Sequence, residues 1–191
     1  HLADLLGPWA VSGPARTVTA AALADREWQA AARNRLAADS ARLATLVGDL
    51  LQLARADQPQ SRVVIDLAQI ATQRVDTWTA LAELSEVTLV LEGAGAPMLA
   101  NAAPGAVEQI LDNTLDNALN VSPAGSRIVV LVAATAERCS LTVRDQGPGL
   151  SDEDKDRATR RFWRKTGATP GTGLGLAIAQ ALARACGGSL R

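Results

Sequence analysis

One segment constrains the fold of this chain more than any other. From about Leu23 to Ala56 the sequence contains no proline and a single glycine, Gly48, and it is rich in alanine, leucine and arginine. Apolar residues recur there at steps of seven, three and four positions, which predicts a long amphipathic helix that packs on other helices rather than on a sheet. This apolar stripe consists of Leu36, Leu43, Leu46, Val47, Leu50, Leu51 and Leu53.

The preceding segment, Ala3 to Ala22, also favours a helix. Gly7-Pro8 and Gly13-Pro14 are expected to bend or interrupt it, because proline lacks a backbone donor and clashes with the preceding turn. The two segments together predict a helical hairpin over residues 1–57. Since one hairpin leaves much of its apolar stripe exposed, we expect two copies to pair into a four-helix bundle. The alternative is that both helices pack on the domain that follows.

The composition excludes several classes of protein. With 191 residues, 48% of them hydrophobic and 20% charged, the chain is expected to fold around one or two cores. The net charge of -1 gives no overall attraction to nucleic acid or to an anionic membrane. The two cysteines, Cys139 and Cys186, are far apart and the only histidine is His1, which argues against a disulfide framework, a zinc cluster or a histidine-based triad. No apolar run reaches the roughly 18 residues that span a bilayer, so we expect a cytoplasmic portion without membrane contact.

A polar stretch that contains a proline, Asp57 to Ser61, marks a linker, and a second domain is expected over residues 62–191. Its patterns mix helices and strands without strict alternation, which is typical of a helix layer over a largely antiparallel sheet. The predicted strands are Val63–Ile65, Thr88–Glu92, Arg127–Ala133 and Ser140–Arg144, and the predicted helices are Leu67–Leu84, Gly105–Val121 and Gly173–Ala185.

The first cluster with chemical potential lies in the helical segment LDNTLDNALNVSP. Asn113 and Asn117 stand four positions apart and therefore project from one face of the helix. Beside Asp112 and Asp116, their amide oxygens suit Mg²⁺, with phosphate groups filling the remaining positions. A solvated polar face accounts for the same pair without any function.

The second cluster is VRDQGPGL, in which Asp145 ends an apolar strand and Gly147 and Gly149 open a loop. A carboxylate fixed at a strand end can accept a hydrogen bond from an exocyclic amine. Glycines let the backbone come close to a flat ring. The alternative is a plain Asp-Gly turn.

The third cluster is GTGLGLAI, a glycine-rich turn from Gly171 that runs straight into an apolar helix. Backbone N–H groups at such a helix start form an anion site suited to phosphate. The glycine spacing differs from GxGxxG, and no lysine follows as it does in a P-loop. A different nucleotide-binding fold is therefore implied.

In this order, the three motifs resemble the ATP-binding domain shared by histidine kinases, Hsp90, gyrase-type ATPases and anti-sigma-factor kinases, the GHKL or Bergerat type. RRFWR at Arg160 to Arg164 is similar to the phenylalanine box of histidine kinases, and LATLVGDLLQLARAD resembles the second helix of their dimerisation and phosphotransfer domain. The resemblance implies an α+β chain, in which the helical hairpin precedes a two-layer α/β sandwich. This sandwich is expected to be C-terminally truncated, because the family continues into at least one more strand after Leu190.

The resemblance further implies a sensor histidine kinase core that binds ATP and Mg²⁺, phosphorylates itself on histidine and transfers the phosphoryl group to an aspartate of a response-regulator receiver domain. It assigns Asn113 and Asn117 to Mg²⁺, with Asn113 also catalytic, and Asp145 to the adenine amine. Gly147 and Gly149 allow approach of the ring, and Arg164 or Lys165 reaches the phosphates. The phosphate turn comprises Gly171, Thr172, Gly173, Leu174 and Gly175. Phe162 and Trp163 would anchor a mobile lid or, alternatively, plug a gap in the core. By family analogy the parent protein is a homodimer anchored in the cell membrane.

The phosphoacceptor position departs from the family pattern. Counting back from Pro8, the histidine position is held by Ala3, with Asp4 in the acidic position as the local general base. The spacing agrees, since 52 positions separate Ala3 from Arg55 (55 − 3). His1 is displaced, and in-line phosphoryl transfer tolerates little displacement. Two alternatives stay open: a degenerate ATP-binding pseudokinase that acts as a conformational switch or scaffold, and an anti-sigma-factor-type Ser/Thr kinase.

Overall fold

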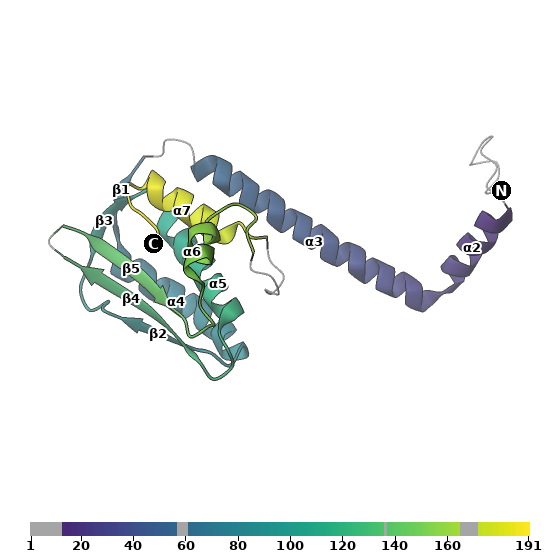
Figure 1. The fold of residues 1–191 in the computed structure, drawn as a ribbon, viewed down its shortest axis with the longest axis horizontal. Coiled ribbons are helices and arrows are strands. Elements are labelled where there is room, and N and C mark those ends of the chain that lie inside the picture. Colours follow the sequence, from purple (N-terminus) through teal and green to yellow (C-terminus); the bar gives the residue numbers. More distant parts are fainter. Residues whose placement is uncertain (1–12, 57–60, 136, 165–171) are drawn as a thin grey trace. The chain divides into compact units, whose positions relative to one another are not determined.

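The computed structural model describes residues 13–56, 61–135, 137–164 and 172–191. Figure 1 labels the helices and strands. The chain divides into two compact units, His1–Leu46 and Val47–Arg191. Among the described residues, no helix is both long enough and apolar enough to cross a membrane.

The N-terminal helices are α2 (Gly13–Ala24) and α3 (Arg26–Ala56), separated by Asp25. The Asp25 side chain accepts a hydrogen bond of 2.8 Å from the backbone N–H of Trp28 and so caps α3. The predicted helix from Leu23 is therefore broken at this residue. Pro14 lies in the first turn of α2, where a missing N–H costs no helical hydrogen bond. Gly13-Pro14 thus lies in the first turn of α2, and the segment before it lies outside the described residues.

The apolar stripe of α3 is largely exposed, with Leu36 at 66% and Leu43 at 61%. Only the end of the helix is buried, at Leu53 and Ala56. This end belongs to the unit that starts at Val47. The exposed stripe is what packing on a further helix requires. The pairing of two copies and the domain boundary after residue 57 stay predictions.

The strands of the second unit form two small sheets. β1 (Val63–Asp66) pairs antiparallel with β3 (Leu99–Ala102). In the other sheet β4 (Arg127–Ala134) is central, parallel to β2 (Thr88–Glu92) and antiparallel to β5 (Cys139–Arg144). The pairing is therefore largely antiparallel, as the sequence predicts, with one parallel pair between β2 and β4.

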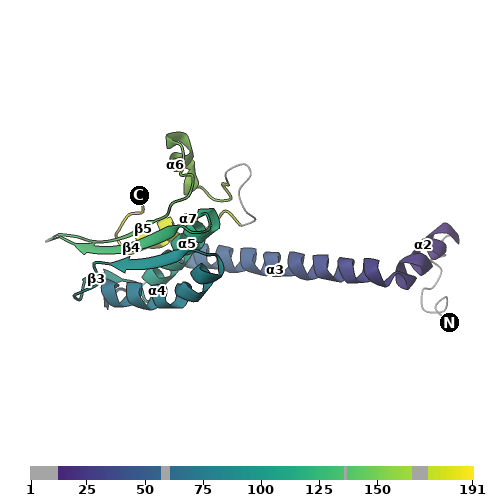
Figure 2. The same ribbon diagram turned by 90° about the horizontal axis from the view of Figure 1, so that it is seen from below.

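A layer of helices covers one face of the sheets, as Figure 2 shows. α4 (Leu67–Leu84) packs on β2 and β4, and α5 (Ala106–Val121) packs on β5 and lies between α4 and α7 (Gly175–Ala185). The short α6 (Asp152–Ala158) contains no buried residue. This arrangement of one helix layer on a sheet layer confirms the predicted α+β class.

The core lies between these layers. Ile128, Val130 and Val132 alternate along β4 and are at most 1% exposed, and Leu111 and Leu115 of α5 are 1% exposed. Alternate residues of a strand share one face, and residues four apart share one face of a helix. The inward face of β4 therefore meets the inward face of α5, which fixes the orientation of the opposite, polar face of α5.

Two predicted helices start too early. The structure begins α7 at Gly175 and not at Gly173, and it begins α5 at Ala106 and not at Gly105. Gly173 has φ +69° and Gly105 has φ +78°, a left-handed conformation that no α-helix contains. These glycines are turn residues that precede the helices.

Candidate functional site

Asn113 and Asn117 lie one turn apart on α5, the first partly buried and the second exposed. The side-chain Nδ2 of Asn113 is buried and has no hydrogen-bond partner among the described residues. A buried polar group without a partner costs free energy that a ligand oxygen would recover. Because the amide can turn over, the same side chain can offer either its N–H or its oxygen.

Asp145 directly follows the last residue of β5. Its Oδ1 accepts a hydrogen bond of 2.8 Å from the backbone N–H of Gly147, which fixes the carboxylate in a local turn. A Cβ at Gly147 would lie 2.8 Å from Val121 Cγ2 and 2.9 Å from the Val121 carbonyl oxygen. Glycine is needed because this loop lies against the C-terminal end of α5. The carboxylate retains acceptor sites beyond its bond to Gly147, so it can also accept from the amine of a purine.

The glycine-rich turn is described from Thr172 onward. A Cβ at Gly173 would lie 2.9 Å from the Trp163 carbonyl oxygen. Leu174 is fully buried, and its backbone N–H donates a hydrogen bond of 3.3 Å to Thr172 Oγ1. α7 begins with no side-chain hydrogen bond capping it. The first N–H groups of α7 have no partners within the helix, and the helix dipole favours an anion there.

The three clusters meet along α5. A Cβ at Gly175 would lie 3.7 Å from Asn113 Oδ1, so the start of α7 adjoins the Asn113 amide. The loop that follows Asp145 contacts Val121 at the end of the same helix. The structure thus brings the start of α7, the Asn113 amide and the loop of the Asp145 carboxylate onto one helix.

The two acids beside the asparagines have different environments. Asp112 Oδ1 accepts a hydrogen bond of 2.7 Å from the indole of Trp78, and Asp112 Oδ2 lies 3.5 Å from Arg74 Nη1. These contacts tie α5 to α4 and occupy both carboxylate oxygens of Asp112. Partial burial raises the pKa of Asp116, a hydrogen bond with Asn120 lowers it, and the negative charge of Asp49 raises it further.

The segment RRFWR lies on the glycine-rich turn. The backbone N–H of Phe162 donates a hydrogen bond of 3.0 Å to the Gly173 carbonyl. Arg164 Cγ lies 3.1 Å from the position of a Cβ at Gly173. Phe162 is 59% exposed, so it fills no gap in the core, whereas Trp163 is partly buried.

One residue of the site carries no signal in the sequence. The hydroxyl of Thr172 donates a hydrogen bond of 2.7 Å to Asp49 Oδ2, across 123 positions of sequence. Asp49 belongs to the polar pattern of an amphipathic helix, and no local motif marks it. The predicted residues His1, Ala3, Asp4, Lys165 and Gly171 lie outside the described residues.

Residues 102–191 match the family described as histidine kinase-, DNA gyrase B-, and HSP90-like ATPase. Over 155 residues the chain is 34% identical to the sensor protein IrlS of Burkholderia pseudomallei, covering 78% of this chain and 33% of that protein. Over 165 residues it is 36% identical to the swarming motility regulation sensor protein RssA of Serratia marcescens, covering 76% of this chain and 35% of that protein. The chain therefore spans about a third of the length of these relatives.

Solved structures are similar as well. The mycobacterial sensor histidine kinase MprB matches with a TM-score of 0.58 at 26% identity, covering 68% of this chain and 83% of that chain. Full-length ShkA, solved in complex with AMPPNP, matches with a TM-score of 0.70 at 26% identity, covering 85% of this chain and 35% of that chain. The shared fold includes α5 and the glycine-rich turn before α7, around which the candidate site is built. Residues 102–191 therefore match the ATPase domain that histidine kinases share with DNA gyrase B and HSP90, and the chain is similar to proteins named as histidine kinases.

Proposed function

We propose that this chain is the catalytic core of a two-component sensor histidine kinase. The parent would use ATP to phosphorylate a histidine and would transfer the phosphoryl group to an aspartate of a response-regulator receiver domain. One observation carries the proposal: Asn113, the Asp145 loop and the start of α7 converge on α5. The relatives that are named sensor proteins support it.

Each part of the site has a role toward ATP. The Asp145 carboxylate would accept a hydrogen bond from the adenine amine, and Gly147 and Gly149 leave room for the ring. The uncapped N-terminus of α7 would hold phosphate oxygens. The turn residues in this role are Gly171, Thr172, Gly173, Leu174 and Gly175. Arg164, which lies beside Gly173, would stabilise negative charge on the transferred phosphoryl group.

Asn113 and Asn117 would hold Mg²⁺. When bound, the ion neutralises charge on the phosphate oxygens. The described residues contain no group of three or more histidine, cysteine, aspartate or glutamate side chains that could hold a metal alone. Amide, phosphate and water oxygens would therefore complete the shell, as Mg²⁺ prefers. Asn113 fits this role if its amide turns over, because its oxygen then takes the place of the unpartnered Nδ2.

A second candidate function rests on the residue at the phosphoacceptor position. That position holds Ala3, which has no nucleophile, although Asp4 could act as a base beside a histidine. A chain that binds ATP without transferring phosphate would act as a conformational switch or scaffold.

Labelled ATP distinguishes the two candidates. The chain and an Ala3→His variant are incubated with γ-labelled ATP and Mg²⁺, and an Ala3→His/Asp145→Asn variant serves as the matched control. Acid-labile label on the Ala3→His variant alone supports a kinase whose acceptor is replaced. ATP binding without label on any variant supports the pseudokinase, and no ATP binding at all refutes both candidates.

We also infer the assembly and the location of the parent. The exposed stripe of α3 supports a homodimer through the helical segment, since Leu36, Leu43, Val47 and Leu51 are all more than half exposed. Relatives named as sensor proteins support a parent anchored in the cell membrane, with this chain on its cytoplasmic side. Sedimentation equilibrium tests the dimer, which Leu43→Glu should dissociate and the surface change Glu83→Lys should not.

A further inference from the structure

Asp49 on α3 is joined to the glycine-rich turn through a single hydroxyl group. Thr172 Oγ1 donates to Asp49 Oδ2 at 2.7 Å and accepts from the backbone N–H of Leu174 at 3.3 Å. Both side chains are partly buried, and both belong to the unit that starts at Val47. The hydroxyl therefore links the last turns of α3 to the residue that precedes α7.

The carboxylate of Asp49 also faces α5. Its negative charge is one of the causes that raise the pKa of Asp116, after partial burial, which is the largest cause. Asp116 precedes Asn117, and Thr172 stands three residues before Gly175. A negative charge from α3 thus acts on α5, to which Mg²⁺ is assigned, and lies beside the turn to which phosphate oxygens are assigned.

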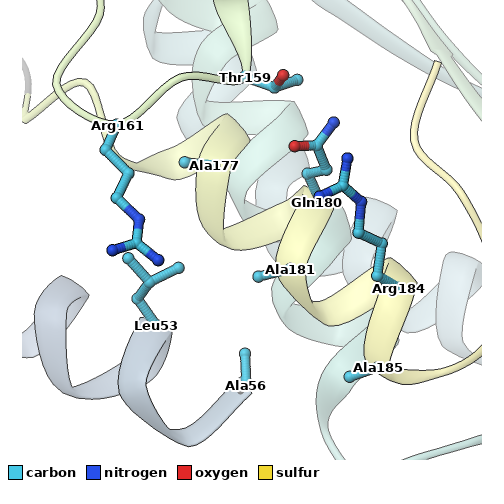
Figure 3. A pocket seen from close by; sticks show the side chains of 9 residues that line it. All are labelled: Leu53, Ala56, Thr159, Arg161, Ala177, Gln180, Ala181, Arg184 and Ala185. Atoms are coloured by element: carbon cyan, nitrogen blue, oxygen red, sulfur yellow. The ribbon is translucent and has the colours of Figure 1, made fainter.

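The rest of this contact between α3 and α7 borders a cavity of about 410 Å³. Leu53 and Ala56 of α3 and Ala177, Ala181 and Ala185 of α7 line it, as Figure 3 shows. The three alanines of α7 offer few atoms for contact with α3. The bond from Thr172 to Asp49 adds a directional polar contact to this packing.

A hydroxyl group donates one hydrogen bond. Thr172 therefore cannot donate to Asp49 and to a phosphate oxygen at the same time. A phosphate at the start of α7 would in addition repel the Asp49 carboxylate, because both are negative. Phosphate binding therefore weakens the contact with α3, and the contact with α3 weakens phosphate binding.

We propose that the Asp49–Thr172 hydrogen bond is a latch that holds the last turns of α3 on the phosphate turn. Binding of the ATP triphosphate breaks this bond and so opens the latch. The proposal rests on the proposed function, since it requires ATP at this site. By thermodynamic reciprocity, the latch weakens ATP binding by the same factor by which ATP weakens the latch. Adenosine carries no phosphate and leaves the latch closed.

Variants at Asp49 test the latch in the chain of 191 residues. Asp49→Asn removes the charge, and Asp49→Glu keeps it. The matched control is Asp39→Asn, which removes a charge from the same helix at a residue whose side chain has no hydrogen bond or ion pair in the described part of the chain. Calorimetry with Mg²⁺-ATP and with adenosine measures the affinity for each ligand. Hydrogen exchange of residues 47–56 measures how strongly the backbone amides at the end of α3 are protected.

Asp49→Asn should bind ATP at least about threefold more tightly than the unchanged chain, with adenosine affinity unchanged. The Asp49→Glu and Asp39→Asn variants should bind ATP like the unchanged chain. In the unchanged chain, ATP should speed exchange of residues 47–56 and adenosine should not. These results together establish a latch that responds to phosphate.

The opposite results overturn the latch. Equal changes in ATP and adenosine affinity would show that Asp49 acts on the fold and not on the phosphates. If Asp49→Asn and the unchanged chain bind ATP equally, and ATP does not change the exchange of residues 47–56, the Asp49–Thr172 bond does not oppose phosphate binding. If no variant binds ATP, the proposed function itself fails and the latch fails with it, an outcome distinct from the first two.

Discussion

Two glycines of the loop after β5 should respond to substitution for different physical reasons. Gly147 has an ordinary φ, but a Cβ there would lie 2.8 to 2.9 Å from two atoms of Val121 and from Asp145 Oδ1. Gly149 has φ +67°, and a Cβ there would meet no atom within 4 Å. Gly147 is therefore required for space, and Gly149 is required for its backbone conformation.

The magnitudes follow from these causes. Gly147→Ala should lower the free energy of unfolding by about 1 to 2 kcal/mol, because the Val121 carbonyl belongs to α5 and cannot move aside cheaply. It should also weaken ATP binding about tenfold, since the new methyl group displaces the Asp145 carboxylate. Gly149→Ala should cost about 1 kcal/mol for the left-handed conformation, partly offset by a stiffer unfolded chain. ATP affinity should fall less than it does in Gly147→Ala, because a methyl group at Gly149 does not displace the Asp145 carboxylate.

Asparagine separates the two causes, because it adopts the left-handed conformation more readily than alanine does. Gly149→Asn should be more stable than Gly149→Ala by about 0.5 kcal/mol, whereas Gly147→Asn should be less stable than Gly147→Ala. Urea unfolding and calorimetry with Mg²⁺-ATP measure both quantities on all four variants. The assignment of causes is refuted if the asparagine variant is more stable than the alanine variant at both positions. It is also refuted if Gly149→Ala weakens ATP binding as much as Gly147→Ala does.

Three further changes test the packing around the site. Arg62 donates a hydrogen bond of 2.6 Å to a carbonyl in the last turn of α7, so Arg62→Ala should lower the free energy of unfolding by about 1 kcal/mol in urea titrations. Trp78→Phe leaves Asp112 Oδ1 without its indole donor and should cost about 1 kcal/mol in the same assay, without changing ATP affinity. The pKa of Asp66 lies below 3.8, first because the Met98 N–H bonds its carboxylate. Its stabilisation is thus present above pH 3.8 and is lost as the pH falls through the lower folded-state pKa. In acid titrations, the difference in free energy of unfolding between the unchanged chain and Asp66→Asn should shrink over that pH range.

The elements with strong local signals could be predicted from the sequence to within a residue or two. The structure places α4 at Leu67–Leu84 and β2 at Thr88–Glu92, the ranges that the apolar periodicity predicts. Asp66 caps α4 by accepting a hydrogen bond of 3.0 Å from the Ala68 N–H, a signal that is present in the sequence itself.

Two elements were missed, for different reasons. β3 is four residues, LANA, without a β-branched or aromatic side chain, and it exists because β1 pairs with it. α6 buries nothing, so apolar periodicity cannot reveal it. Its local signals were nevertheless present: Ser151 accepts a hydrogen bond from the Asp154 N–H, and Glu153 pairs with Arg157 one turn later.

For the site, the sequence identified residue types but not their partners. Asn113, Asp145 and the glycine-rich turn are local motifs, so their order alone pointed to a nucleotide. The contacts that join Asp112 to Trp78 and Thr172 to Asp49 depend on how α4 and α3 pack. No pattern along α5 distinguishes Asp112 from Asp116, because both lie beside an asparagine and only the neighbouring helices differ.

The central claim is that α5, the Asp145 loop and the start of α7 form one ATP site. Calorimetric titration of the chain with Mg²⁺-ATP, beside Asp145→Asn, tests it most directly. The account predicts saturable binding at one site and a loss of about tenfold or more in the variant, because the amide cannot replace both the charge and the acceptor sites of the carboxylate. ATP affinity that is equal in the two proteins would contradict the account, as would a chain that does not bind ATP.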